Sequence, residues 1–524
     1  MLWSKVFPNS YRDSVLLMKM AGNIRKLPDV ENAEVMIATA ANKEILRFNG
    51  LLTDEISAAS PNDLVVSVHA KTEEAAAEAI RKAEELIFSG NSAVGSKETG
   101  ASPERVGTVR AAVSMMPGAN MALLSIPGPL VKKEAMDLLD RGVNIMIFSD
   151  NVPIEEELEI KKKAQEKDLL VMGPDCGTAI INGTALCFAN AVTRGNIGMV
   201  CASGTGLQEV SCIISNMGRG ISNAIGTGSK DVSDYIGGIT LKQGLKMLER
   251  DPRTDIIVVL CKPSGENVRR EAMEEFERCD KPLVVNFLGS DEPMGCHGKV
   301  WYARTLEEAA FKALEISGVE EKAPDENAPE IRAFIEGEAE KIRAGHKGSV
   351  YLRGLYTGGT LAAESDVICK DRLGTVYSNM EIPGCIPLSD PNQSEGNTII
   401  DLADDFFTLG KPHAMIDPET KNLRMLKESL DPEAGVFLLD FVLGYGINED
   451  PAGNTLDFIR ESRANAEKEG RHISFVASVC GTDEDPQKRS EQVRMLQELG
   501  VFVLPTNAAA ARVAAEIVLA CGRE

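Results

Sequence analysis

The sequence predicts a multidomain α/β protein in which Rossmann-like and flavodoxin-like parallel sheets follow a small α+β N-terminal module. The first observation is length: 524 residues exceed what one hydrophobic core can organise, so we expect roughly three or four domains. The second is the pattern of the strands, which are continuous apolar runs rather than alternating ones. Such strands are buried on both faces, and amphipathic helices between them are typical of parallel sheets.

Composition and charge restrict the class of partner. The formal net charge is −23, and an acidic surface does not attract nucleic acid or an anionic membrane. No stretch is long and apolar enough to cross a bilayer, and the N-terminus lacks the apolar core of a signal peptide. The 11 cysteines form no Cys-x-x-Cys pair, as expected in the reducing cytoplasm. The 5 histidines show no ligand-like spacing, so we expect no metal site.

The N-terminal residues 1–90 mix short strands with helices in an order that indicates an α+β ferredoxin-like module. A segment rich in Ser, Gly and charge, residues 90–105, is typical of a linker. Besides a first short strand, the expected elements are strands at 32–39, 43–49 and 63–70 and helices at 13–27 and 72–88.

Residues 106–190 alternate strands and helices and predict a first parallel sheet. Strands are expected at 121–127, 143–150 and 168–175, with helices at 132–142 and 154–168. Each strand ends in a polar or Pro/Gly turn, at 126–129, 148–153 and 173–178. Because ligands bind at the carboxyl ends of strands in open parallel sheets, we expect these three turns to share one edge.

Two further blocks repeat the alternation. Residues 191–318 form one, residues 319–346 are expected to be a linker helix, and a third α/β block fills residues 347–524. Expected strands are 196–203, 223–230, 255–263, 282–289, 349–356, 398–403, 435–444, 472–481 and 501–506. In the third block, helices are expected at 424–430, 454–469, 489–500 and 509–519.

The stretch CASGTGLQEV, residues 201–210, predicts an anion site. An apolar strand runs into Ser203-Gly204-Thr205-Gly206, and a helix follows. Backbone N–H groups at a helix start carry partial positive charge and bind phosphate. The alternative is a tight βα connection without a ligand. Glu209, on the first turns of that helix, is as well suited to capping as to chemistry.

Two other glycine turns extend this hypothesis. Gly444-Tyr445-Gly446 with Asn448 follows an apolar strand, and we expect it to face the 203–206 turn across one anion. The stretch from Arg353 to Thr360, which includes Gly358 and Gly359, is expected to form a third wall, with Arg353 clamping a substrate carboxylate. A surface turn is the alternative for this stretch.

The order of these turns resembles a known family. Residues 108–318 resemble the α subunit of succinyl-CoA synthetase, and residues 397–520 resemble the carboxy-terminal domain of its β subunit. One chain that carries both, without an ATP-grasp domain, is identified as a member of the FdrA family of acyl-CoA synthetase-like proteins. The matching stretches are 126–129, 148–153, 173–178, 198–205, 226–234, 251–260, 412–417, 435–446 and 475–482.

The resemblance implies sheets of the succinyl-CoA synthetase type and a truncated CoA-binding domain at 106–190. The CoA-like positions are Pro127, Gly128, Pro129, Gly173, Pro174 and Asp175. The glycine-rich unit that holds the nucleotide part of CoA in that enzyme has no counterpart here, which argues against CoA. The phosphohistidine segment has its nearest match at Gly295–Gly298, around His297, and Lys262-Pro263 stands where a supporting acid belongs. We therefore expect no phosphohistidine.

The reaction that the FdrA resemblance implies is carbamoyl transfer between oxalurate and phosphate, giving oxamate and carbamoyl phosphate. Phosphate is then a co-substrate, no metal is needed, and self-association or companion subunits are expected. Alternatives are an acyl-CoA ligase subunit with a separate ATP-grasp partner, and a non-catalytic metabolite-binding scaffold. The catalytic candidates are Ser203, Thr205, Lys262 and His413. The binding candidates are Gly204, Gly206, Glu209, Ser229, Lys230, Arg353, Gly358, Gly359, Thr360, Gly444, Tyr445, Gly446 and Asn448.

Overall fold

The computed structural model divides the chain into two compact units. The smaller contains Met1–Glu104 and Asp405–His413, and the larger contains Arg105–Asp404 and Ala414–Glu524. The structure describes every residue except 9, 11–13, 40–41, 44–45, 48, 62, 90–105, 262–264, 291–293, 347, 409–411 and 523–524. For residues 14–16, 18–19 and 88–89 it describes the backbone alone. The expected linker at 90–105 thus lies outside the described residues.

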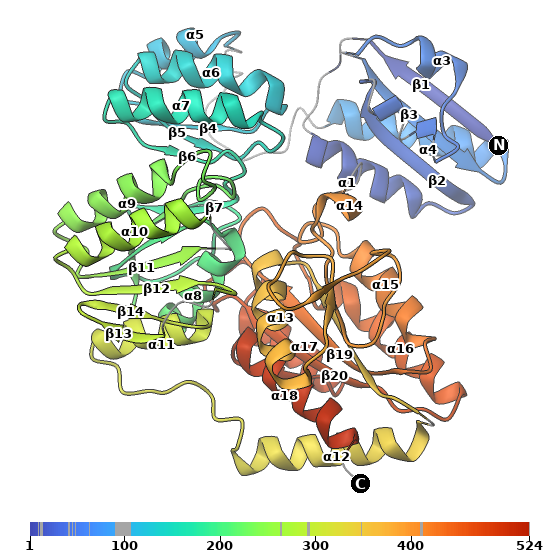
Figure 1. Cartoon of the computed structure of the whole chain (residues 1–524). Coiled ribbons are helices and arrows are strands. Elements are labelled where there is room, and N and C mark those ends of the chain that lie inside the picture. Colours follow the sequence, from blue (N-terminus) through green and yellow to red (C-terminus); the bar gives the residue numbers. More distant parts are fainter. Residues whose placement is uncertain are drawn as a thin grey trace. The chain divides into compact units, whose positions relative to one another are not determined.

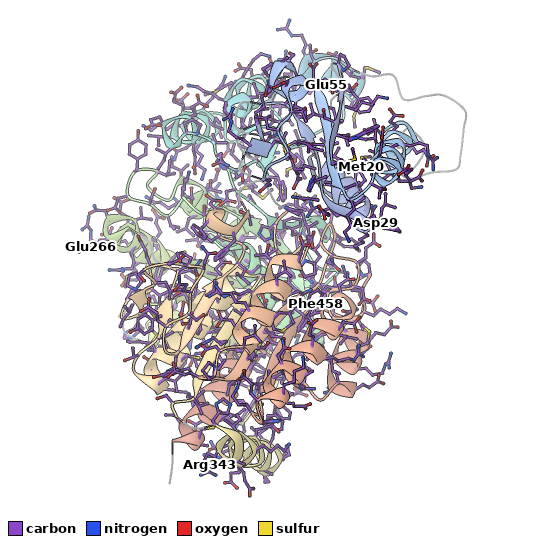
Figure 2. The ribbon with its side chains drawn as sticks, turned by 90° about the vertical axis from the view of Figure 1, so that its right-hand side faces the viewer. Met20, Asp29, Glu55, Glu266, Arg343 and Phe458 are labelled. Atoms are coloured by element: carbon purple, nitrogen blue, oxygen red, sulfur yellow. The ribbon has the colours of Figure 1, made fainter. Side chains whose placement is uncertain are left out.

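The smaller unit is built on an antiparallel sheet in the order β1-β3-β2 (Figure 1). The strands are Leu2–Phe7 (β1), Val30–Ile37 (β2) and Leu64–Ala70 (β3). Helices α1 (Ser14–Arg25) and α4 (Glu73–Ser89) bury one face, where Met20, labelled in Figure 2, is 4% exposed. The segment around Leu46, Leu51 and α3 (Asp54–Ala58) covers the other face.

The strand predicted at 43–49 is wrong. Residues 42–43 and 46–47 are helical, and Leu46 is buried beside exposed Arg47. Leu46 packs in the core on that face of the sheet, and its contact there holds the helical conformation over the strand that the local pattern predicts.

The larger unit contains three sheets, of which the first is parallel in the order β4-β5-β6. Its elements are α5 (Val109–Met115), β4 (Met121–Leu124), α6 (Gly128–Asp140), β5 (Asn144–Ile147), α7 (Ile154–Glu166) and β6 (Val171–Met172). Ser149 joins two of the predicted edge turns: its Oγ accepts the Ile126 N–H at 2.9 Å and its carbonyl accepts the Asp175 N–H at 3.0 Å. The prediction of a shared edge is confirmed.

The second sheet has the order β13-β14-β12-β11-β9-β10-β7-β8, with β14 to β10 parallel. Its hairpin β7–β8 pairs with β10, so this sheet starts before the boundary expected at residue 190. The strands are Thr178–Ile181 (β7), Thr184–Cys187 (β8), Arg194–Cys201 (β9), Ile221–Gly226 (β10), Ile256–Cys261 (β11), Leu283–Phe287 (β12), Gly295–His297 (β13) and Val300–Tyr302 (β14). The helices are Gly204–Asn216 (α8), Ile239–Arg250 (α9), Glu266–Arg278 (α10) and Leu306–Ile316 (α11).

The third sheet is parallel throughout, in the order β17-β16-β18-β15-β19-β20-β21. Its strands are Tyr351–Tyr356 (β15), Tyr377–Ser378 (β16), Ile386–Pro387 (β17), Thr398–Asp401 (β18), Ala434–Val442 (β19), Ser474–Cys480 (β20) and Phe502–Leu504 (β21). The helices are Pro329–Gly345 (α12), Gly359–Leu373 (α13), Glu419–Ser429 (α15), Leu456–Lys468 (α16), Arg489–Glu498 (α17) and Asn507–Cys521 (α18), while Asp405–Thr408 (α14) belongs to the smaller unit. Every residue of β19 is buried, as a strand covered on both faces should be.

The multidomain α/β fold class predicted from the sequence is confirmed: parallel sheets follow a small α+β module along the chain (Figure 1). None of the helices that the structure describes is long and apolar enough to span a bilayer.

Candidate functional site

The start of helix α8 has the local geometry that the sequence predicts. Strand β9 ends at Cys201, and Ser203 caps the helix, with its Oγ accepting the Gly206 N–H at 2.9 Å. A Cβ on Gly206 would lie 2.5 Å from that Oγ, so only glycine fits. The first turn of a helix leaves N–H groups without partners inside the helix, and here they follow a buried parallel strand.

The start of helix α13 faces the start of α8. Gly358 caps α13, and Thr360 Oγ1 lies 2.6 Å from Ser203 Oγ. The Thr360 N–H also donates to Thr205 Oγ1 at 3.2 Å. The sequence analysis named all of these residues as candidates of the first turn or of the third wall. The structure therefore brings two helix N-termini together, which is the arrangement predicted for an anion, but from a different pair of turns.

The turn 444–446 contacts the segment before β9 and helix α8. The Tyr445 N–H donates to the Ala189 carbonyl at 3.0 Å, and Gln208 in α8 donates to the Leu443 carbonyl at 3.3 Å. The next helical residues begin only at Gly453, so Gly444 and Gly446 do not stand at a helix start. The second and third blocks therefore pack together, and at the start of α8 their contact is made by Thr360.

Asn448 and Tyr445 serve the loop around this turn. Asn448 Nδ2 donates to the Ile416 carbonyl at 3.0 Å and its Oδ1 accepts the Asp450 N–H at 2.9 Å. Tyr445 is 45% exposed and lines a hollow of about 610 Å³ together with Asn190 and Glu484. The hollow's described lining includes the acid Glu484 and no Lys or Arg side chain, which does not favour a phosphate.

Asp440 is a site residue that the sequence analysis missed. Its carboxylate accepts the N–H groups of Thr357 at 2.8 Å and of Gly358 at 2.7 Å, which fixes the turn into α13. Burial raises the pKa of Asp440, and buried Lys421 donates to its carbonyl at 2.8 Å. The available signal was a single acid inside the apolar run VFLLDFVL.

Asp401 flanks the same turn from strand β18. A Cβ on Gly359 would lie 2.4 Å from Asp401 Oδ2, so Gly359 must be glycine for the carboxylate to come this close. Together, Asp440 and Asp401 place two carboxylates around the start of α13, and the α8 side supplies the hydroxyls.

Arg353 is not a substrate clamp, and this prediction was wrong. Its guanidinium is 1% exposed and donates from Nε to Glu428 Oε2 at 2.9 Å; it also pairs with Asp431. Arg353 lies in the first half of β15, away from the turn that ends the strand. A buried guanidinium whose donors are engaged by its own chain cannot bind a ligand.

Glu209 also has an internal partner. Its Oε1 accepts the N–H of Asn507, the first residue of α18, at 2.9 Å. Burial raises the pKa of Glu209. The carboxylate thus caps a helix, as the capping alternative predicted, but that helix is α18 and not its own.

The candidates Ser229 and Lys230 lie beside the CoA-like positions. Ser229 Oγ donates to Asp175 Oδ2 at 2.6 Å, and Lys230 is exposed. A Cβ on Gly228 would lie 2.2 Å from the Pro174 carbonyl oxygen, next to Gly173. The turn after β10 and the turn after β6 therefore touch.

The other CoA-like positions form the start of α6. Pro127 is the N-cap and Pro129 lies in the first turn, while a Cβ on Gly128 would lie 2.3 Å from the Asn151 carbonyl oxygen. Across residues 106–120 the structure describes one helix, α5, before β4 and no strand. The described residues thus lack the glycine-rich unit for the nucleotide part of CoA and do not fit the whole cofactor.

Three further residues were singled out in the sequence, and the structure describes two of them. Lys262 lies outside the described residues. His413 belongs to the smaller unit, and burial lowers its pKa to about 4, so its imidazole is neutral at pH 7. His297 is on β13, an exposed edge strand, where Nε2 lies 3.3 Å from the Met294 carbonyl oxygen.

Comparison with known proteins agrees with this geometry. Residues 1–103 match the family described as AllF, heavy metal-associated domain, and residues 355–517 match CoA-ligase. The chain is 28% identical over 195 residues to the α subunit of the ADP-forming succinate–CoA ligase of Aquifex aeolicus, covering 36% of this chain and 62% of that one. The solved ATP citrate lyase of Methanothrix soehngenii is 14% identical, with a TM-score of 0.35 and 79% and 84% of the two chains covered. The CoA-ligase match and the succinate–CoA ligase relative place the chain in the acyl-CoA synthetase superfamily.

A relative that matches almost the whole chain shows which family the chain belongs to. The protein YahF of Escherichia coli (strain K12) is 41% identical over 517 residues, which is 98% of this chain and 97% of that one. The chain belongs to the FdrA family of acyl-CoA synthetase-like proteins.

The heavy-metal description of the N-terminal family does not fit the donors of this module. The first cysteine of the chain is Cys176, so residues 1–103 contain no thiolate. Among the described residues, no group of three His, Cys, Asp or Glu side chains is placed to hold a metal ion. Soft metal ions prefer thiolate and thioether ligands. We assign no metal step to this module.

The stability of the larger unit should fall as pH rises through the titration of Glu364 on α13. Its Oε1 accepts the Leu306 N–H at 2.7 Å and its Oε2 accepts Asn507 Nδ2 at 2.8 Å. Burial raises the pKa of Glu364 from 4.5 to about 8, so between these values the folded chain holds a proton that the unfolded chain releases. One such group lowers the free energy of unfolding by about 1.4 kcal/mol per pH unit.

Denaturant unfolding between pH 5 and pH 8 measures this slope. Glu364→Gln should flatten it, and Glu498→Gln, which changes an exposed acid paired with Arg494, should leave it unchanged. An identical slope in the wild type and in Glu364→Gln would show that this carboxyl is not the titrating group.

Proposed function

We propose that this chain is the subunit of a phosphate-dependent acyltransferase that moves a carbamoyl group between oxalurate and phosphate. A phosphate oxygen attacks the carbamoyl carbon, the C–N bond to the oxamate nitrogen breaks, and that nitrogen takes a proton. The products are carbamoyl phosphate and oxamate. The 2.6 Å contact between Ser203 Oγ and Thr360 Oγ1, which joins two helix starts, is the observation that carries the proposal.

The two helix starts supply what this reaction needs. Phosphate must be held in line with a carbonyl carbon, and the oxyanion that develops on that carbon needs hydrogen-bond donors. Helix N–H groups and the hydroxyls of Ser203, Thr205 and Thr360 are such donors, and both helices follow buried strands that fix them. A bound anion replaces the direct Ser203–Thr360 hydrogen bond, and Lys262 is the proposed cation beside it.

Asp440 and Asp401 hold the α13 side of this site in place. Because Asp440 engages the N–H groups of Thr357 and Gly358, the donors left for a ligand are those further into the helix start. Companion subunits are part of the proposal, since the succinate–CoA ligase relatives are named as subunits.

A second candidate function is that of an acyl-CoA ligase subunit. The match of residues 355–517 to CoA-ligase and the similarity to succinate–CoA ligase favour it. The incomplete nucleotide-binding half of the first sheet opposes it. Calorimetric titration with CoA separates the two: saturable CoA binding supports the ligase, and its absence supports the phosphate-dependent transferase.

Ser203→Ala should raise the KM for phosphate roughly fivefold, because one neutral hydrogen bond contributes about 1 kcal/mol. The KM for oxalurate should change less, since the hydroxyl contacts the phosphate in our proposal. The measurement is a phosphate titration of oxamate formation with companion subunits present.

The matched control is Ser215→Ala, which removes a hydroxyl from the far end of the same helix. Lys262→Ala should raise the phosphate KM more than Ser203→Ala does, because charge-assisted contacts are roughly twice as strong. An unchanged phosphate KM in both variants, or oxamate formation without phosphate, would end the proposal.

A further inference from the structure

A hollow lined by two cations lies in the larger unit, away from the paired helix starts. Its volume is about 250 Å³, and its wall includes Gly289, Ser290, Arg304, Lys370 and Gly384. Gly289 and Ser290 follow strand β12, at the carboxyl edge of the second sheet, and Lys370 lies on α13. Lys370 is eleven residues after Gly359, which at 1.5 Å per residue places it about 16 Å along the helix from its start.

The described ion pairs at this hollow contain two cations and one acid. Asp371 pairs with Arg304, and the same carboxylate lies 3.6 Å from Lys370 Nζ. Among the described ion pairs, these two cations share this one acid. On a chain whose formal net charge is −23, two cations that share one acid among the described residues favour an anionic ligand.

The wall also offers a hydroxyl without a partner. Ser290 Oγ is buried, and among the described residues it makes no hydrogen bond. Leaving a buried polar group unsatisfied costs free energy, so such groups in native structures usually meet water or a ligand. A hydroxyl donates readily to an oxyanion, and the two cations beside it favour the same class of ligand.

Two glycines keep the hollow open. Gly289 has φ +75° and Gly384 has φ +84°, conformations that side chains rarely adopt. A Cβ on Gly384 would lie 2.6 Å from Lys370 Cε. The lysine stem therefore passes directly over a glycine, and a larger residue there would push its ammonium group out of the wall.

We propose that this hollow binds a small oxyanion with two negative charges, of the phosphate or dicarboxylate kind. Arg304 presents a planar donor pair, Lys370 a point charge, and Ser290 a neutral donor, which is the combination that phosphate and carboxylate oxygens accept. The volume of about 250 Å³ is below the usual range of drug-sized sites, which favours a small anion. This site is separate from the one formed by Ser203 and Thr360 and does not depend on the reaction proposed for it.

The test is calorimetric titration of the full-length protein with inorganic phosphate and, separately, with malonate. The double variant Arg304→Gln with Lys370→Gln should weaken binding of the preferred anion by about tenfold or more, since hydrogen bonds to charged groups are the strong ones. Ser290→Ala should weaken it by a smaller factor. The control is Lys246→Gln with Arg278→Gln, which removes an equal charge from the exposed surface of α9 and α10.

Each outcome decides the proposal. Anion binding that is lost in the double variant, retained in the control and retained in Ser203→Ala supports it, and the tighter anion of the two names the source. Binding that is equal in the wild type and the double variant, or equally reduced in the control, overturns it, as does the lack of saturable binding of either anion. Thermal melts of all variants confirm that each is folded when it is titrated.

Discussion

Replacing Lys161 with methionine should lower the free energy of unfolding of the larger unit by about 3–5 kcal/mol. Its side chain is completely buried, and Nζ lies 2.7 Å from Asp231 Oδ1 and 2.8 Å from Glu157 Oε1. It also donates to the Thr227 carbonyl at 3.0 Å. Removing the cation leaves two buried carboxylates without their counter-charge, which costs far more than the ion pair contributes when intact.

The measurement is guanidinium unfolding followed by tryptophan fluorescence. The chain has two tryptophans, Trp3 in the smaller unit and Trp301 in the larger, so a Trp3→Phe background lets Trp301 report the larger unit alone. Lys163→Met, which breaks a 2.7 Å pair with Asp140 at the surface of the same helix, should cost about 1 kcal/mol or less. If Lys161→Met were as mild as Lys163→Met, the buried network would not be holding the first two sheets of this unit together.

Gly206→Ala should abolish most of the proposed activity with only a small loss of stability. The added Cβ would lie 2.5 Å from Ser203 Oγ and 3.2 Å from Thr360 Cγ2, so it displaces the cap and separates the two helix starts. A displacement on the order of 1 Å at a site that positions reactants can cost about 100-fold in rate. Alanine favours a helix over glycine by up to about 1 kcal/mol, which offsets the strain in the folded state.

The comparison for this variant is Gly337→Ala on α12, where a Cβ meets nothing within 4 Å. Turnover of oxalurate with phosphate and the unfolding midpoint are measured for both variants. Normal turnover in Gly206→Ala would mean that the contact between α8 and α13 has no part in the reaction.

The start of α8 could be predicted from the sequence because its causes are local. A buried apolar strand, a Ser at the cap position and glycines where the backbone turns sharply all lie within ten residues. The same holds for strands such as β19, whose apolar run needs no knowledge of its neighbours. The shared edge of the three turns of the first sheet could also be predicted, because the carboxyl ends of parallel strands lie at the same edge of a sheet.

The errors at the site come from partners that are distant in sequence. Arg353 looks like a ligand clamp until Glu428 and Asp431, from the end of α15 and just beyond it, are placed against it. Helix α13 was not predicted as a helix, since it is buried all round and carries Glu364 and Asp366 in its interior. These acids are tolerated because Asn507, Ser378 and the start of α11 bind them, and no local signal reveals such partners.

The turn 444–446 shows the limit of a motif without its context. Glycines after a buried strand resemble a phosphate turn, but a loop with Asp450 and Pro451 separates Gly446 from the next helix. Without a helix start behind it, the turn lacks the aligned N–H groups that an anion site requires. The 358–360 turn, predicted as a third wall, has that helix and takes the place opposite Ser203.

The most direct test of the central claim is a crystal of the protein with its companion subunits, soaked in carbamoyl phosphate and oxamate. Our account predicts a tetrahedral anion between the starts of α8 and α13, within hydrogen-bond distance of Ser203 and Thr360, with the direct bond between their hydroxyls opened. An intact 2.6 Å Ser203–Thr360 contact, in crystals that turn over and hold phosphate elsewhere, would contradict it.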